Sequence, residues 1–352
     1  MSKTIPESFA VTERGVRKAA RHCPHSIAFP SMMSALKTFM GLPPRLRDIR
    51  AHSVIWKADD DYYFQTGVSS ESFGLLYGTG NVLKSGKWDN QTIRDSFDAE
   101  GIRFRLIADD TVPIKNGELN PDTIKDEITA HLLADKPAVL LRNSSYEGIL
   151  CKLAIGYAEF GNVLTVGDCA KGVRIAKTAK FDANWMDKTF AVIFIDGITE
   201  PSDRKSIVYR ALDRAHAMLT ANESFDNGYG YGKQMWDKWI SRLDDDANYR
   251  AKSHSLRYIT PEKFDLAERR CYGADFFDQT SDVTGEDLSV AAQSFRAIHD
   301  KMWNIHWLVT GSNEGKLIER ETRNKVIEIL NECREFDRKS AENIKQVLNH
   351  MK

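Results

Sequence analysis

The chain has 352 residues, with 49 Lys and Arg against 50 Asp and Glu, a formal net charge of −1 and 42% hydrophobic residues. This length and apolar content suit one large domain or two ordinary ones. The balanced charge lacks the basic excess typical of proteins that bind nucleic acid or anionic lipid. No run of about 18 apolar residues is present, so we expect no membrane-spanning segment, no membrane partner and no nucleic-acid partner.

Cysteine usage points to a reducing compartment. The five cysteines are odd in number, scattered along the chain and never arranged as CxxC. Residues 1–20 contain no apolar core of signal-peptide length. We therefore expect reduced thiols and a cytoplasmic location, with neither a zinc ribbon nor another metal or cofactor site.

The first clear element is a helix in FPSMMSALKTFMG, which Pro30 and Ser31 can start and Gly41 can stop. Its apolar residues recur every three to four positions, as a helix with one buried face requires. The pattern that follows is aromatic and glycine-rich. It predicts a short helix near 46–57 and then loops.

From residue 90 the pattern becomes regular. It predicts a helix ending at Gly101, the strand IRFRLIA, a helix opened by Asn120-Pro121-Asp122 and the strand PAVLLRN. GILCKLAIGYAEFGNVLTVGD then predicts two strands joined by a tight turn, and 188–198 predicts a further strand. Because the late strands follow one another without helices between them, we expect an antiparallel sheet with helices packed beside it, which is an α+β fold.

After Pro201 strand patterns stop, and five segments show helical periodicity. These predict a helical bundle. The sequence therefore predicts two domains, an α+β domain at 1–200 and a mostly helical one at 201–352.

Several short motifs resemble a known superfamily. Ser34-Ala35-Leu36 lies in the first helix, Lys136-Pro137 precedes a strand, Gly156-Tyr157 ends the next strand, and Asp168 ends the strand after that. Their order is similar to that of papain-like cysteine peptidases of the peptidase C39-like type, and closest to the branch with the N-terminal domain of butirosin biosynthesis protein H. The resemblance covers residues 20–200. It implies a papain-like antiparallel sheet with a packed first helix and a catalytic triad.

Two triad positions depart from that pattern. Papain-like chemistry needs a thiolate at a helix amino terminus and a histidine on a neighbouring strand as base. This chain has Ser31 at the expected start of the helix, and no histidine near Leu150 or Cys151, where the resemblance places the base. Only Asp168 matches, as the member that would orient the base.

Two candidates for the nucleophile and three for the base stay open. Ser31 can be a nucleophile, a helix cap, or a replacement of an original cysteine. Cys23 is flanked by His22 and His25 in RHCPHS and can be a displaced nucleophile with one of these histidines as base, or a surface residue. His52 is a third source of a base.

The other conspicuous residues have a structural reading beside the functional one. Asp168 can orient a base or cap a turn, and Cys151 is typical of an apolar core. GYGYGK at 228–233 can line a ligand pocket, although no strand pattern precedes it as a dinucleotide site needs. His299 and His306 are seven residues apart, which is too far for one shared metal ion on a helix. Asp59–Asp61 and Asp244–Asp246 lack calcium-loop spacing.

Two functions follow as hypotheses. The first is acyl transfer or amide hydrolysis on a papain-like scaffold, with Ser31 or Cys23 as nucleophile, His25 as one candidate base and Asp168 as orienter. The second is a non-catalytic relative that holds a small molecule or peptide in the same cleft. Four tryptophans of the helical half, Trp236, Trp239, Trp303 and Trp307, predict either helix packing or a homodimer surface.

Overall fold

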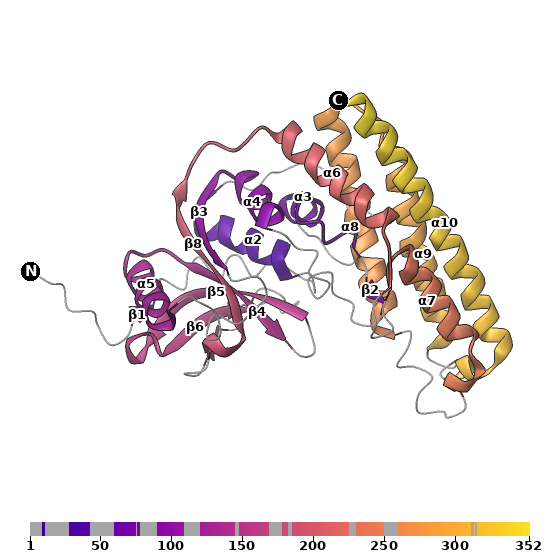
Figure 1. Cartoon of the computed structure of the whole chain (residues 1–352), viewed down its shortest axis with the longest axis horizontal. Coiled ribbons are helices and arrows are strands. Elements are labelled where there is room, and N and C mark those ends of the chain that lie inside the picture. Colours follow the sequence, from indigo (N-terminus) through magenta and orange to yellow (C-terminus); the bar gives the residue numbers. More distant parts are fainter. Residues whose placement is uncertain are drawn as a thin grey trace, which may run out of the picture. The chain divides into compact units, whose positions relative to one another are not determined.

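A computed structural model gives the fold. It describes residues 9–10, 28–42, 60–74, 76–77, 90–108, 120–144, 148–168, 178–181, 185–224, 230–249, 260–310, 313 and 315–352. The chain divides into two compact units (Figure 1): unit 1 comprises Met1–Gln65 and Asp89–Ser202, and unit 2 comprises Thr66–Trp88 and Asp203–Lys352. The sequence predicts one boundary at 200/201, whereas this division also assigns Thr66–Trp88 to the unit that contains the carboxyl-terminal helices.

Unit 1 is built on a seven-stranded sheet in which all neighbouring strands are antiparallel. Along the sheet the order is β3-β8-β4-β5-β6-β7, and β1 pairs with β5. The strands are β1 Phe9–Ala10, β3 Ile102–Ala108, β4 Ala138–Ser144, β5 Gly148–Ala158, β6 Val163–Asp168, β7 Thr178–Phe181 and β8 Thr189–Ile198. The predicted α+β class and the predicted β5–β6 hairpin are confirmed.

The described helices of unit 1 cover both faces of this sheet. They are α2 Ala28–Phe39, α4 Asn90–Asp98 and α5 Pro121–Leu133, with 3-10 turns at Glu159–Gly161 and Trp185–Lys188. On one face Phe104 of β3 packs against Phe97 of α4, and Phe97 in turn packs against Phe29 of α2. On the other face Phe194 of β8 packs edge-on against His131 of α5.

Helix α2 confirms the apolar stripe, since Met32, Met33 and Leu36 are fully buried. Its first residue is Ala28, however, and not Pro30 or Ser31. Ser31 is therefore the fourth residue of the helix. The expectation that it caps the helix is wrong, because an N-cap residue precedes the first helical turn. At the other end Gly41 has a φ of +70°, the left-handed conformation in which glycine commonly ends helices.

The pattern predicts loops after residue 57, and this prediction is wrong for residues 60–68. Helix α3 runs from Asp60 to Val68 and carries buried Tyr62, Tyr63 and Phe64. The division between the two units falls within α3, between Gln65 and Thr66. The predicted helix near 46–57 lies outside the described residues.

Unit 2 confirms the five predicted helices. They are α6 Arg204–Thr220, α7 Lys233–Asp244, α8 Thr260–Thr284, α9 Ser289–Val309 and α10 Arg320–His350, with 3-10 turns at Asp246–Tyr249 and Lys316–Ile318. Within the unit, α9 packs between α8 and α10, and α6 and α7 both contact α10 (Figure 1).

Strands continue after Pro201, although the pattern predicts none. A small sheet has the order β2-β10-β9, formed by β2 Leu76–Tyr77, β9 Asn222–Ser224 and β10 Gly230–Gly232. β10 is the GYG fragment that suggested a pocket lining. Its Tyr231 is buried instead, and Gly230 lies so close to α7 that an added Cβ would come within 2.3 Å of the Gln234 carbonyl oxygen.

Candidate functional site

The predicted catalytic residues lie on separate elements, and the structure describes part of them. Cys23 and His25 lie outside the described residues, as do His22 and His52. Ser31 lies in the first turn of α2, and Asp168 is the last residue of β6. Helix α2 packs against β5, the strand that precedes β6.

Strand β5 is apolar at the position where the resemblance places a base. Cys151 is fully buried and lies opposite Leu141 of β4, which is also fully buried. Leu153, the next residue on the same face of β5, is buried as well. This part of β5 belongs to the hydrophobic core, as the sequence predicts for Cys151.

The sheet register bears on the predicted role of Asp168. Asp168 lies opposite Lys152 of β5, Lys152 lies opposite Leu140 of β4, and Leu140 lies opposite Val192 of β8. Directly opposed residues share one face of a sheet, and every second residue of a strand does so too. Register position 168 therefore belongs to the same face as Phe194.

That face is the one covered by α5, because Phe194 packs against His131. Helix α2 covers the opposite face, to which Phe104 belongs, through the contacts of Phe97 with Phe104 and with Phe29. A carboxylate at position 168 and a nucleophile on α2 thus belong to opposite faces of the sheet. The triad proposed from the resemblance stays a prediction.

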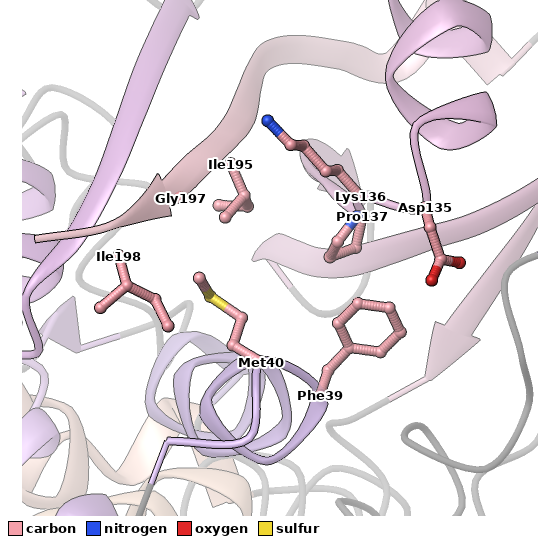
Figure 2. A pocket seen from close by; sticks show the side chains of 8 residues that line it. All are labelled: Phe39, Met40, Asp135, Lys136, Pro137, Ile195, Gly197 and Ile198. Atoms are coloured by element: carbon pink, nitrogen blue, oxygen red, sulfur yellow. The ribbon is translucent and has the colours of Figure 1, made fainter.

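A cavity of about 430 Å³ lies at the carboxyl end of α2 (Figure 2). Its lining residues come from the end of α2, the turn between α5 and β4, and the end of β8. They are Phe39, Met40, Asp135, Lys136, Pro137, Ile195, Gly197 and Ile198. This volume falls within the ordinary range for small-molecule sites, roughly 300–1,000 Å³.

The cavity and Ser31 lie at opposite ends of α2. Phe39 is the last residue of the helix, eight positions after Ser31. At about 1.5 Å of rise per residue, eight positions correspond to roughly 12 Å along the helix axis. The cavity is therefore distinct from a papain-like active site, which would lie at the amino end of the helix.

The cavity forms where β8 extends beyond its neighbour β4. The last paired residues are Phe194 of β8 and Ala138 of β4, so the following backbone groups of β8 lack a strand partner on that side. Two side chains replace the missing strand. His131 Nε2 accepts a hydrogen bond from the Ile195 amide at 3.1 Å, and Lys136 Nζ donates to the Asp196 carbonyl oxygen at 3.0 Å.

The hydrogen bond to Ile195 requires a neutral His131 ring, because an imidazolium has no acceptor nitrogen. Burial lowers the pKa of His131 below its ordinary value, and the nearby Lys136 and Arg105 lower it further. The carboxylate of Asp196 acts in the opposite direction. His131 thus acts as an acceptor that holds the strand end, and it lies on the α5 side of the sheet.

The cavity combines apolar walls with two oppositely charged residues. In Figure 2 the apolar side chains of Phe39, Met40 and Ile198 face the space below β8, while the ammonium of Lys136 and the carboxylate of Asp135 point to different sides. Asp135 is exposed, whereas Lys136 is half-buried. The sequence marks Lys136-Pro137 as the start of a strand, but no local pattern signals that three distant segments meet there.

Two of the four tryptophans named for a dimer surface are not available for it. Trp236 and Trp239 of α7 are buried and stacked on each other, and the Trp236 indole donates to Asp337 of α10. Trp307 of α9 is 65% exposed and packs beside Trp303. A dimer surface at these last two residues stays a prediction.

The remaining candidates in unit 2 are occupied by structural contacts. His299 Nε2 accepts a hydrogen bond from the Trp303 indole, and Asp244 and Asp246 pair with Arg320 at the start of α10. Among the residues that the structure describes, no three His, Cys, Asp or Glu side chains are grouped to hold a metal ion.

No protein-family model matches the chain, and no curated protein matches it either. None of the described helices is both long and apolar enough to cross a membrane.

Proposed function

We propose that unit 1 is a small-molecule-binding domain built on a papain-like fold, and that it holds its ligand in the cavity at the carboxyl end of α2. The fold kinship is supported by the antiparallel sheet, the β5–β6 hairpin and the packing of α2 against β5. It also agrees with the order of the short motifs that suggested this superfamily.

The cavity of about 430 Å³ is the single observation that carries the proposal. A site of this size with mostly apolar walls gains binding free energy by removing the apolar surface of a ligand from water. The part of β8 that extends beyond β4 and the two side chains that bond to it give the cavity a defined edge.

Binding is favoured over acyl transfer because no base is available in the described part of unit 1. His131 is the one histidine there, and its ring is engaged with the Ile195 amide on the α5 side of the sheet. Cys151 occupies the core position that the base would need. A nucleophile that acts without a base is slower by several orders of magnitude.

The test is ligand binding to the wild-type protein and to M40W, in which the larger indole fills the cavity. V290W is the matched control, since Val290 lies on α9 and is 46% exposed. Alcohols and aromatic alcohols of six to ten carbons are titrated by calorimetry. We expect saturable binding to wild type and V290W, and at least about tenfold weaker binding to M40W.

Turnover of a thioester or amide substrate that disappears in C23S or S31A would contradict this proposal and support the acyl-transfer hypothesis. If M40W and V290W bind the alcohols with equal affinity, the ligand binds at a site other than this cavity. Absence of saturable binding to the wild type would overturn the proposal outright.

A further inference from the structure

The chemistry of the cavity lining points to the class of ligand. We propose, on the basis of the function proposed above, that the ligand is an apolar monocarboxylate and that Lys136 is the residue that binds its carboxylate. The alkyl or aryl part of such a ligand would lie against the side chains at the end of α2 and the end of β8.

The walls suit a hydrocarbon body. Phe39 and Met40 form one side, Ile195 and Ile198 the other, and Pro137 closes the space beside Lys136. The side chain of Ile198 is 55% exposed, and it is one of the few large hydrophobic side chains of the described residues that are exposed to this degree. A bound hydrocarbon chain would remove part of this surface from water.

Lys136 has hydrogen-bonding capacity left for an anion. An ammonium has three donors, and the described structure uses one of them, for the Asp196 carbonyl oxygen at 3.0 Å. That bond holds the side chain along the edge of β8. The acceptor of that bond is an uncharged carbonyl oxygen, so the bond does not neutralise the ammonium charge.

Asp135 also lines the cavity, but its charge has less influence on a bound ligand. It is exposed and lies in a turn with a φ of +59°, so water screens its carboxylate. Lys136 is half-buried and acts through a medium of lower effective dielectric constant. The lining therefore favours an anion over a cation of the same shape.

The experiment compares octanoate, octanol and octylammonium as calorimetric titrants of the wild-type protein at low and high salt. We expect octanoate to bind roughly tenfold more tightly than octanol, which is the size of effect a charge-assisted hydrogen bond supplies. Octylammonium should bind most weakly. High salt should reduce the octanoate preference.

Two variants of Lys136 then test whether this residue causes the preference for octanoate over octanol. K136Q removes the charge and should make octanoate and octanol bind equally well, while K136R should retain the preference. R103Q is the matched control, because Arg103 is an exposed cation near the lining residue Gly197 but is not itself part of the lining. R103Q should retain the preference too.

The possible failures are distinguishable. Equal binding of octanoate and octanol to wild type, or a preference that survives in K136Q, overturns the ligand class while leaving the binding function intact. Binding of none of the three probes overturns the proposed function itself. The wild-type comparison needs no variant, so the inference stays testable even if K136Q does not fold.

Discussion

The protonation state of His131 affects the edge of the cavity. Its neutral imidazole accepts the hydrogen bond from the Ile195 amide, and Ile195 lines the cavity. The charged groups that face it are Lys136, Asp196 and Arg105, and Arg105 is itself paired with Glu127 of α5. Protonation of the ring would remove the acceptor and add a charge beside two cations.

We expect acid to weaken this hydrogen bond. The pKa of His131 is lower in the folded protein than its ordinary value of 6.5. The unfolded chain therefore binds this proton first as the pH falls, and stability declines from pH 6.5 down to the lowered pKa. Hydrogen exchange at the Ile195 amide, corrected for intrinsic rates, should speed up over this window in the wild type and less so in H131Q.

H216Q is the control for that measurement. His216 of α6 also has a pKa lowered by burial and by Lys345, but it belongs to unit 2. Its replacement should leave the pH dependence of Ile195 exchange unchanged. If exchange at the Ile195 amide speeds up with acid as much in H131Q as in the wild type, protonation of His131 is not the cause.

A second titratable residue, Asp337, is buried in unit 2. Its Oδ2 accepts hydrogen bonds from Arg270 Nη2 at 2.9 Å and from the Trp236 indole at 3.1 Å. Arg270 also donates to the carbonyl oxygens of Ser72 and Phe73. Burial raises the pKa of Asp337, and the attraction of Arg270 opposes that effect.

Breaking this pair should be costly. We expect D337N to reduce the free energy of unfolding by about 3–5 kcal/mol, because Arg270 is left charged and buried without a counter-charge. E335Q breaks the pair of Glu335 with Arg338, whose side chains are 47% and 51% exposed, and should cost far less because water screens exposed charges. Urea unfolding measures both, and equal costs would contradict the role given to burial.

At the scale of elements, α3 meets α8 at a glycine. A Cβ at Gly67 would lie 2.2 Å from the ring of Phe276, so the two helices approach each other as closely as they do because residue 67 has no side chain. Both residues belong to unit 2. The sequence gives no sign of this contact, since the partners are more than 200 positions apart.

G67A should therefore destabilise the protein by about 1–3 kcal/mol through overpacking. F276L in the same background should restore part of that loss by making room for the methyl group. In G41A, where an added Cβ meets nothing within 4 Å, F276L should give no recovery. Thermal or urea unfolding of G67A and G41A, each with and without F276L, measures these effects. The proposed contact between residues 67 and 276 would be contradicted if F276L stabilised neither glycine variant, or both of them equally.

Elements with a local pattern could be predicted from the sequence. Helix α5 has an asparagine cap and buried Ile124, Ile128 and Leu132 at helical spacing, and the β5–β6 hairpin has two apolar runs around a tight turn. Strands β2, β9 and β10 have two or three residues each and carry no period. Helix α3 could not be predicted because apolar Tyr62–Phe64 and polar Gln65 and Thr66 are all buried, so its sequence shows no separate apolar and polar faces.

The candidate site was less predictable than the fold, for a physical reason. The cavity exists because β8 is longer than β4 and because α2 ends beside that overhang. Strand register and relative length depend on contacts between distant segments, which no local pattern encodes. The resemblance implies an active site at the amino end of α2, whereas the cavity lies at the other end of this helix.

At the scale of the whole molecule, the two units are not consecutive in sequence. Thr66–Trp88 belongs to unit 2, and its Phe73 lies within a ring cluster formed by Phe276, Phe277 and Phe295. Glu71 of the same segment forms a buried ion pair with Arg269 of α8, with 2.5 Å between oxygen and nitrogen. The carboxyl-terminal helices therefore depend on a segment far upstream.

A fragment of residues 203–352 should fold poorly by itself. It would leave the guanidinium groups of Arg269 and Arg270 without their partners in 71–73, and it would expose the ring cluster. Joining 66–88 to its amino terminus should restore cooperative unfolding in circular dichroism. If the fragment 203–352 unfolds as cooperatively as the fragment joined to 66–88, the assignment of Thr66–Trp88 to unit 2 is contradicted.

The most direct measurement of the central claim distinguishes the two ends of α2. Methyl groups of methionine and isoleucine are labelled, and octanoate and octanol are titrated while their NMR shifts are followed. Met40, Ile195 and Ile198 report on the cavity, and the buried Met32 and Met33 report on the turn that contains Ser31. We predict saturable shifts at the first three methyl-bearing residues and none at Met32 or Met33. Shifts concentrated at Met32 and Met33 would contradict the account.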